Sequence, residues 1–356
     1  MSGRYPFPAV PDGWFAIAAS DDIGAGQVST VRLLDRELVA FRGEDGRVRV
    51  FDAYCPHLGA HLGVGGRVCG DGIVCPFHGW RFDGDGRLAE VPRLDRRPPQ
   101  VSARTWEVRE RNGRVFVWHH ANGAPPSYDL ATYRGDGTWT PWRVDGYRVR
   151  THVQELSENI IDQSHFYEVH DMVPPDDERL DVAFDGHVMV VDQNIKVTAI
   201  AEEGVEVRTR TTVCGPGIVA VEVREGPLDM LTYITQTPVD EEHTEITICF
   251  SMKALDDERA TASIAELNAR ITNLQFTQDI PIWENKVYRD RPRLTAMDGP
   301  IARYRRWFRQ FYSTWEPSHG AERPDRTADA PPAAGPRPDS AATGRDTAAA
   351  QSEVFG

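Results

Sequence analysis

The sequence predicts an α+β protein with two domains, of which the first is all-β and the second combines helices with an antiparallel sheet. Three observations support this prediction. Short apolar segments separated by turn residues fill residues 11–120, and two Cys/His pairs with ligand-like spacing lie among them. Alternating segments over 182–252 and an amphipathic stretch over 256–288 follow. A length of 356 residues suits two domains and a tail.

The first domain is expected over residues 11–120, after an N-terminal arm of residues 1–10. Its apolar or alternating segments are Trp14–Ala18, Leu38–Phe41, Val48–Phe51, Gly79–Phe82 and Arg114–Trp118. We expect these segments to form short strands, because β-branched and aromatic residues are frequent in them and turn residues separate them. Residues 121–145 are rich in Gly, Pro and polar side chains, so they are expected to connect this domain to the next.

The strongest chemical signal is the 24-residue stretch from Cys55 to His78. Cys55 and His57 form a C-x-H pair, and Cys75 and His78 form a C-x-x-H pair after a spacer of 17 residues. Two thiolates and two imidazoles can hold a metal or a cluster, and His in place of Cys on one iron is typical of a Rieske [2Fe–2S] cluster. We expect the two cysteines to bind one iron and the two histidines to bind the other.

A structural zinc ion is the alternative, because Cys2His2 zinc sites are common. Zinc modules usually have C-x2–4-C or H-x3–5-H pairs, whereas each pair here combines Cys with His and has Pro directly after the Cys. This pattern favours the cluster. Cys69 and His61 lie inside the stretch without ligand spacing and are expected to be packing or loop residues.

Composition excludes several classes of protein. The formal net charge is −14, from 54 Asp and Glu against 40 Lys and Arg, which argues against nucleic acid or an anionic membrane as the main partner. Cys69, Cys214 and Cys249 remain beside the two predicted cluster ligands, and an odd number gives no disulfide framework. No signal-peptide pattern and no long apolar run occur. We expect a cytoplasmic protein without a transmembrane segment.

The second domain is expected over residues 146–315. It begins with a predicted helix, Gln154–His170, and ends with the amphipathic segment Asp256–Tyr288 and an aromatic cluster within 304–312. The apolar residues at helical spacing in the long segment are Ile264, Leu267, Ile271 and Leu274. The predicted strands between the helices are Val188–Val191, Ile195–Ile200, Val205–Thr212, Ile218–Val223, Leu231–Thr237 and Glu245–Ser251. Residues 316–356 contain mostly Pro, Ala, Gly, Asp and Arg, and we expect them to be disordered.

A second candidate metal site lies in the helix predicted at Gln154–His170. Asp162 and His165 are three residues apart, so on a helix they share a face. His170 follows His165 by five residues, so the helix must end or bulge before His170 if both histidines bind one metal. Lone histidines are more often core or surface residues. An electron-transferring cluster, however, needs an acceptor, and iron bound by two His and one carboxylate is a suitable one.

The carboxylate of this second site is expected to come from elsewhere in the domain. Asp279 is the preferred residue, because it lies late in the long helical segment and Pro281 beside it loosens the helix. Glu284 and Asp171 are the alternatives. The residue pattern alone leaves all three open.

Taken together, these motifs resemble Rieske non-heme iron oxygenases from Pro11 to about Tyr312. The matching stretches are CPHLGAHLGVGG, CPFHGWRFDGDG, ENIIDQSHFYEVH and QDIPIWENKVY. Within that family the chain is similar to the steroid-handling branch, which includes Neverland-type cholesterol 7-desaturases and the oxygenase component of 3-ketosteroid 9α-hydroxylase. This similarity rests on DAYCPHLGA (Asp52–Ala60), FDGHV (Phe184–Val188), QDIPIWENK (Gln278–Lys286) and YRRWFRQFYS (Tyr304–Ser313).

The resemblance implies a Rieske domain followed by a helix-grip (START-like) catalytic domain. It implies His165, His170 and Asp279 as ligands of a mononuclear Fe(II). It also implies that Asp162 bridges an iron-ligand histidine and a cluster histidine of the neighbouring subunit, in a homotrimer, and so carries electrons between subunits.

The implied activity is that of a terminal oxygenase with O2 as co-substrate, which hydroxylates or desaturates a steroid-like polycycle. No glycine-rich nucleotide-binding motif occurs, so a separate NAD(P)H-dependent flavin reductase is expected to supply electrons, directly or through a ferredoxin. The sheet positions expected to line an apolar substrate cavity are Val188, Val190, Ile218, Val221 and Ile234. Other polycyclic natural products and aromatic compounds are alternative substrates. The rivals from other classes are an electron-transfer Rieske protein with a lipid-binding domain and a zinc-structured interaction module.

Overall fold

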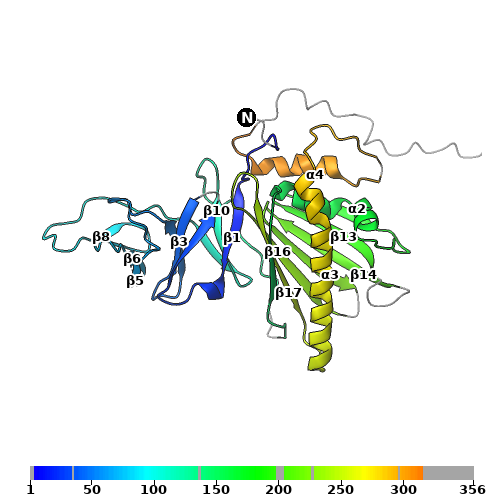
Figure 1. Ribbon diagram of the computed structural model, residues 1–356, viewed down its shortest axis with the longest axis horizontal. Coiled ribbons are helices and arrows are strands. Elements are labelled where there is room, and N and C mark those ends of the chain that lie inside the picture. The colour runs from blue at the N-terminus through cyan, green and yellow to red at the C-terminus, as the bar shows by residue number, and fades with distance from the viewer. Residues whose placement is uncertain are drawn as a thin grey trace, which may run out of the picture. The chain divides into compact units, whose positions relative to one another are not determined.

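The computed structural model describes residues 4–33, 36–134, 138–197, 204–225, 228–295 and 297–315. The tail predicted to be disordered, residues 316–356, lies outside these ranges. Two regions of different architecture follow each other along the described chain, first a set of small sheets and then one large sheet with helices (Figure 1). None of the described helices is long and apolar enough to cross a membrane.

The first region contains three small antiparallel sheets, with strand orders β1-β10-β9, β2-β3-β4 and β5-β6-β7-β8. Its elements are β1 (Gly13–Ala19), η1 (Ser20–Asp22), β2 (Val28–Leu33), β3 (Arg36–Arg42), β4 (Val48–Asp52), β5 (Arg67–Cys69), β6 (Gly72–Val74), β7 (Arg81–Phe82), β8 (Leu88–Glu90), β9 (Val108–Arg111) and β10 (Arg114–His119). Four of the five strands expected here from the sequence are confirmed, and the fifth, expected at Gly79–Phe82, is a strand only at Arg81–Phe82. The remaining strands of this region, β2, β5, β6, β8 and β9, have three or four residues or carry polar side chains, so their apolar pattern is weak.

Two cysteines belong to the apolar core of the first region. Cys55 and Cys75 are buried in a cluster with three phenylalanines, Phe41, Phe51 and Phe82. The loops that carry the cysteines are therefore packed against a rigid base formed by β3, β4 and β7, which fixes their positions.

The second region is built on a seven-stranded antiparallel sheet with strand order β11-β17-β16-β15-β14-β13-β12. Its strands are β11 (Arg143–Val149), β12 (Leu180–Asp185), β13 (Val188–Val197), β14 (Val205–Cys214), β15 (Ile218–Glu225), β16 (Met230–Pro238) and β17 (Thr244–Met252). The strands expected at Val188–Val191 and at Ile195 onward are one continuous strand, β13. The two edge strands, β11 and β12, were not predicted.

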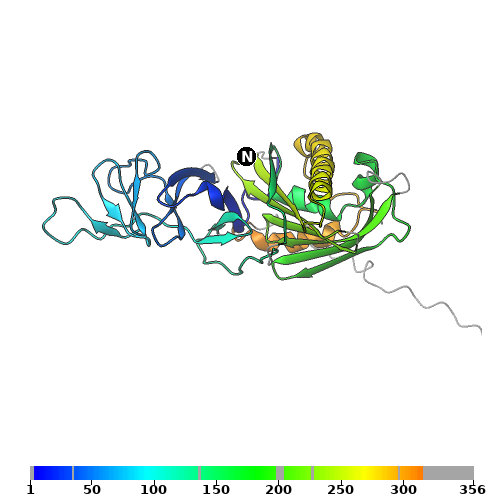
Figure 2. The same cartoon turned by 90° about the horizontal axis from the view of Figure 1, so that it is seen from below.

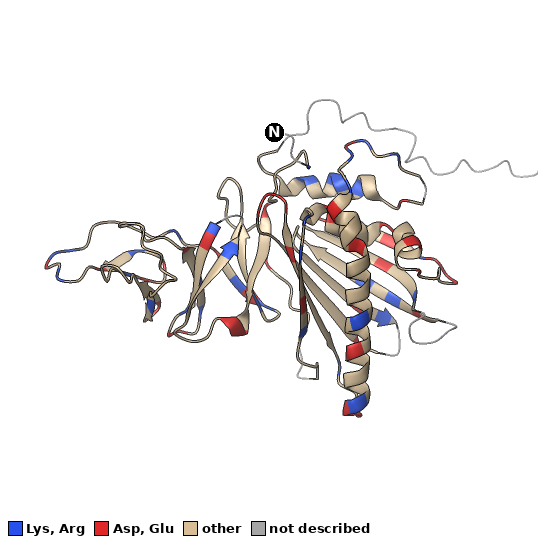
Figure 3. Ribbon diagram, in the orientation of Figure 1, with Lys and Arg blue, Asp and Glu red and all other residues tan. Residues whose placement is uncertain are grey.

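The long helix α3 (Glu258–Asn285) crosses one face of this sheet, as Figures 1 and 2 show from two directions. Asp257 caps it by accepting hydrogen bonds from the N–H groups of Arg259 and Ala260, at 2.8 and 3.2 Å. Charged residues occur along its length (Figure 3). The predicted apolar stripe is wrong at Leu274, which is 58% exposed. The buried positions of the helix are Thr261, Ala265, Asp279 and Trp283.

The single helix expected at Gln154–His170 is wrong, because this segment is broken into three pieces. These pieces are α1 (Val153–Glu158), the 3-10 turn η2 (Asn159–Ile161) and α2 (Ser164–Val169). Further along, α4 (Ile301–Phe308) and η3 (Arg309–Phe311) pack their aromatic side chains against α1.

Candidate metal centres and substrate cavity

The loops around Cys55 and Cys75 have the same backbone hydrogen bonds. Each cysteine N–H donates to the carbonyl five residues later, of Ala60 or Trp80, at 2.8 Å in both loops. Each cysteine carbonyl accepts a hydrogen bond from the glycine four residues later, at 2.9 and 3.1 Å. Both glycines have positive φ, +76° and +71°, which the turn requires. The two loops therefore have nearly the same backbone geometry in the folded chain.

The four predicted cluster residues are arranged with thiols inside and imidazoles outside. Cys55 and Cys75 are each 2% exposed and their thiols are in contact, and burial raises the pKa of the Cys55 thiol to about 11. The rings of His57 and His78 are 4.7 Å apart, and His57 stacks on Trp80 at 4.0 Å. The buried Nδ1 of His57 has no hydrogen-bond partner among the described residues, so a ligand-binding atom is left free there. This arrangement fits a Rieske [2Fe–2S] cluster.

A single zinc ion fits these loops less well. A tetrahedral ion requires its ligand atoms to lie within about 4 Å of one another. Within the described ranges, three or more such atoms come within 4.8 Å of one another at His165, His170 and Asp279, and not at the two loops. The residues expected not to be ligands have other roles, since Cys69 lies in β5 and His61 Nδ1 accepts a hydrogen bond from Gly63 N–H at 3.0 Å.

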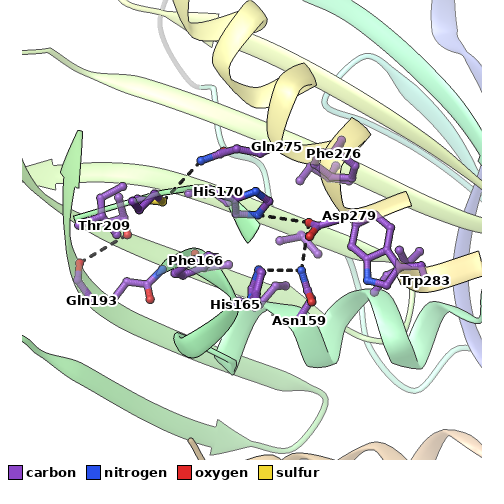
Figure 4. A pocket seen from close by; sticks show the side chains of 18 of the residues that line it. Asn159, His165, Phe166, His170, Gln193, Thr209, Gln275, Phe276, Asp279 and Trp283 are labelled. Atoms are coloured by element: carbon purple, nitrogen blue, oxygen red, sulfur yellow. Dashed lines mark hydrogen bonds and ion pairs between the residues drawn. The ribbon is translucent and has the colours of Figure 1, made fainter. Parts of the chain in front are cut away.

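Three elements bring the residues of the second candidate centre together. His165 lies near the start of α2, His170 directly follows its last turn, and Asp279 projects from α3 (Figure 4). His170 Nε2 lies 3.5 Å from Asp279 Oδ2, and Asp279 is only 7% exposed. The helix ends before His170, as the five-residue spacing required. The two alternative carboxylates lie elsewhere, with Asp171 exposed and Glu284 accepting a hydrogen bond from Arg150 N–H.

Outer hydrogen bonds aim both imidazoles at the same point. The carbonyl oxygen of Asp162 contacts Nδ1 of His165, and Gln278 Oε1 lies 3.0 Å from Nδ1 of His170. Since Nδ1–H donates outward in each ring, Nε2 is the atom left for a metal. Burial lowers the pKa of His165. Burial would also lower the pKa of His170, but hydrogen bonds with Asp279 and Gln278 raise it above its ordinary value.

Asn159 contributes to this centre and was not predicted from the sequence. Its side-chain nitrogen lies 2.9 Å from His165 Nε2 and 3.2 Å from Asp279 Oδ2 (Figure 4). Gln278 was also missed as an outer partner. The one feature of the sequence that could have indicated Gln278 is its position directly before Asp279. A residue next to one candidate ligand can reach the ring nitrogen of another that faces away from the metal.

Asp162 is not on a helical face with His165, contrary to the expectation. It lies between η2 and α2 with extended backbone, and its Oδ2 is 4.0 Å from His165 Nδ1. Its Oδ1 is buried without a partner among the described residues, and burial raises the pKa of this carboxyl.

A cavity of about 210 Å³ lies beside His165, His170 and Asp279, between α3 and the sheet. The remaining residues that line it are Leu156, Asn159, Ile160, Phe166, Met172, Gln193, Ile195, Thr209, Thr211, Val219, Val221, Ile234, Gln236, Gln275, Phe276 and Trp283. The predicted lining is confirmed at Val221 and Ile234. It is wrong at Val188, Val190 and Ile218, because the opposite face of β13 and of β15 points into the cavity. None of the described lining residues is Lys or Arg.

Two family profiles match the chain. The Rieske [2Fe-2S] domain matches residues 13–112, and the 3-Ketosteroid 9alpha-hydroxylase C-terminal domain matches residues 117–312. A probable 3-ketosteroid-9-alpha-monooxygenase oxygenase component from Rhodococcus rhodochrous is 33% identical over 322 residues, which cover 84% of this chain and 79% of the relative. The chain belongs to the Rieske oxygenase family. It is therefore an oxidoreductase that uses O2, and its cofactors are a Rieske [2Fe–2S] cluster and a mononuclear iron.

Other relatives of this Rieske oxygenase include cholesterol 7-desaturase nvd 1 of Ciona intestinalis, which is 30% identical over 87% of this chain and 70% of the relative. Among solved structures, dicamba monooxygenase bound to dicamba superposes with a TM-score of 0.67 at 19% identity, over 84% of this chain and 96% of that one. Pseudomonas putida CBB5 NdmA superposes with a TM-score of 0.65 at 20% identity, over 83% and 88%. These structures support the two-domain fold, an all-β Rieske domain followed by a catalytic domain with an antiparallel sheet.

Proposed function

We propose that this protein is the terminal oxygenase component that hydroxylates or desaturates a steroid- or sterol-like polycycle. Electrons from NAD(P)H would reach it from a separate flavin reductase, directly or through a ferredoxin. The observation that carries the proposal is the cavity at His165, His170 and Asp279, whose described lining has many aliphatic and aromatic side chains and no Lys or Arg. Its aliphatic and aromatic walls would contact a hydrocarbon body within reach of the candidate iron ligands.

The residues proposed to hold the mononuclear iron are His165, His170 and Asp279, and those proposed to hold the cluster are Cys55, His57, Cys75 and His78. When bound, the two groups supply single electrons and the activation of O2 that C–H oxidation requires. The protein orients the imidazoles through Asp162 and Gln278 and places the Asp279 carboxylate through its hydrogen bond with Asn159. The side chains of Phe276 and Trp283 exclude water on the α3 side.

The lack of Lys and Arg among the described lining residues argues against an acidic substrate. A benzoate-sized acid would need a fixed cation nearby, and none of the described lining residues is Lys or Arg. Aliphatic and aromatic walls instead favour a ligand bound mainly by burial of apolar area. The relatives from Rhodococcus rhodochrous and Ciona intestinalis are described as acting on 3-ketosteroids and cholesterol, which supports a substrate of that size.

The cavity must widen to admit such a substrate. Its volume of about 210 Å³ is below the roughly 300 Å³ at which sites for drug-sized ligands begin. Met172 is a lining residue with a flexible side chain, and among the described residues its sulfur makes a weak contact with Gln275 Nε2, at 3.7 Å. We therefore include displacement of Met172 in the proposed binding step.

The proposal also includes a homotrimer in which Asp162 links His165 to a cluster histidine of the neighbouring subunit. The support is that Asp162 Oδ1 is buried without a partner among the described residues, while its carbonyl oxygen contacts His165. A partner from another subunit would satisfy this oxygen.

The experiment is a product screen with the reconstituted system, using the holoenzyme, a flavin reductase, a ferredoxin and NAD(P)H. Sterols, ketosteroids, other polycyclic natural products and benzoate-sized acids serve as candidates. We expect O2 uptake coupled to NAD(P)H oxidation and an oxidised product with a steroid-sized polycycle. Tight coupling with a small aromatic acid, and none with any polycycle, would overturn the proposal.

A further inference from the structure

The cavity also has a polar end away from the candidate iron ligands. We propose that Gln193, Thr209 and Thr211 form a binding site for a hydroxyl group of the substrate, so that the enzyme prefers a polycyclic alcohol to the corresponding ketone. This inference rests on the proposed function and specifies the substrate of the same site.

Gln193 is the residue that points to a ligand. It lies on β13, lines the cavity and is 6% exposed, yet its Oε1 is buried without a hydrogen-bond partner among the described residues. An unpaired buried amide oxygen is costly for the folded protein. A residue of this kind in a cavity wall is best explained by a bound group that supplies the missing hydrogen bond.

Two threonines on the next strand lie beside Gln193. In the antiparallel pairing of β13 with β14, Gln193 is directly opposite Thr209, and Val191 is opposite Thr211. Side chains two residues apart on a strand share a face, so all of these positions face the cavity side of the sheet. Thr209 is 3% exposed and Thr211 2% exposed. Valine has about the same volume as threonine, and a buried valine, Val213, does follow Thr211 by two residues on β14.

The polar end is separated from the iron ligands. Figure 4 shows Gln193 and Thr209 on one side of the pocket and Asp279 and Trp283 on the other, with Phe166 between them. A rigid substrate that places an oxygen at Gln193 therefore presents a different part of its body to His165, His170 and Asp279.

The hydrogen-bonding groups at this end favour a hydroxyl. Thr209 Oγ1 donates to the carbonyl oxygen of Gln193 at 3.5 Å, so its lone pairs are left to accept. Gln193 Oε1 is an acceptor as well, and Gln193 Nε2 is a donor. A hydroxyl can donate to an acceptor and also accept from Nε2. A ketone can accept from Nε2 but leaves Oε1 unpaired. Rotating the Gln193 amide so that its O and N change places does not remove this difference between hydroxyl and ketone.

The test measures binding to the holoenzyme of three steroids that differ at one terminal position only, carrying a hydroxyl, a ketone or hydrogen there. Trp283 lines the cavity, so tryptophan fluorescence reports occupancy. For the wild type we expect the alcohol to bind at least about tenfold more tightly than the ketone or the deoxy steroid. In Gln193→Leu this preference should fall to near unity, while deoxy-steroid binding and iron content are retained.

Gln275→Leu is the matched control for the preference, because Gln275 also lines the cavity but contacts Met172 instead. Any effect through Met172 should change the affinity for all three steroids by the same factor, so this variant should keep the preference. Thr209→Val is a second variant, which loses only a hydroxyl and should weaken the preference. It keeps the inference testable if Gln193→Leu fails to fold. A wild-type preference for the ketone, or an unchanged preference in both Gln193→Leu and Thr209→Val, would overturn this inference alone. Failure of every polycycle to bind would overturn the proposed function with it.

Discussion

Gln278 Oε1 lies 3.0 Å from Nδ1 of His170, on the side of the imidazole that faces away from the candidate iron position. Because Gln278 directly precedes Asp279 on α3, one turn of helix supplies both a candidate ligand and the group that orients another candidate ligand. This pairing fixes which ring nitrogen of His170 remains available for a metal.

Replacing Gln278 should therefore weaken iron binding without removing a ligand. For Gln278→Leu we expect the affinity for Fe(II) to fall by roughly 10- to 100-fold, as is usual when the outer partner of a ligating histidine is lost. Titration of the mononuclear site with Fe(II) measures this. Gln275→Leu, one turn earlier on α3, should bind iron like the wild type. Equal affinity in all three proteins would show that Gln278 does not orient His170.

Cys75→Ser should abolish the cluster, because loss of one thiolate opens one iron to solvent. The reduced protein should then lack the Rieske EPR signal. Cys69→Ser is the control, since Cys69 lies in β5 and has no ligand spacing, and it should keep the signal. A Rieske signal in Cys75→Ser would contradict the assignment of the cluster ligands.

Asp162→Asn should keep both metal centres but slow electron transfer between subunits strongly. The expected reason is that an amide in place of the carboxylate disturbs the link between His165 and the neighbouring subunit. Single-turnover oxidation of a pre-reduced enzyme measures the rate, and sedimentation measures the oligomeric state. Wild-type rates in an intact trimer would remove the bridging role of Asp162.

Acid should destabilise the protein partly through His152, which caps α1. Burial lowers the pKa of His152 from 6.5 to about 4 in the folded chain. The unfolded chain therefore binds a proton that the folded chain does not, and stability is lost as the pH falls from 6.5 towards 4. The shift corresponds to up to about 3 kcal/mol.

His152→Asn removes this titration and keeps a side-chain acceptor for the Gln154 N–H. Urea unfolding at pH 7.5 and at pH 5 should show a smaller loss of stability on acidification for the variant than for the wild type. His119, whose pKa burial also lowers to about 4, is present in both proteins and does not affect the difference. Identical pH dependence would mean that His152 is not buried in neutral form.

Local residue patterns were enough to propose the two candidate centres from the sequence. The pairs at Cys55 and Cys75 keep their candidate ligands within two or three residues, so spacing alone indicated the two loops. The end of the helix before His170 followed from the angle between residues five apart. Asp279 required more, because a helix of 28 residues offers several carboxylates and packing against the sheet decides which is buried.

The face of a strand and the outer contacts of a site depend on tertiary packing. In β13, the run Val188–Val191 is apolar on both faces, so no alternation shows which side is inward, and the inward residue Gln193 is polar. The contacts of Asn159 with His165 and Asp279 arise only because η2 interrupts the expected helix. Neither feature has a periodic pattern in the sequence.

The most direct measurement is the iron and acid-labile sulfide content of the purified wild type and of Asp279→Ala, with Glu284→Ala as control. The account predicts three irons and two sulfides per chain in the wild type and in Glu284→Ala, from one cluster and one mononuclear site. In Asp279→Ala it predicts two irons and two sulfides, because only the mononuclear iron is lost. Three irons in Asp279→Ala together with two in Glu284→Ala would contradict the assignment of the iron ligands.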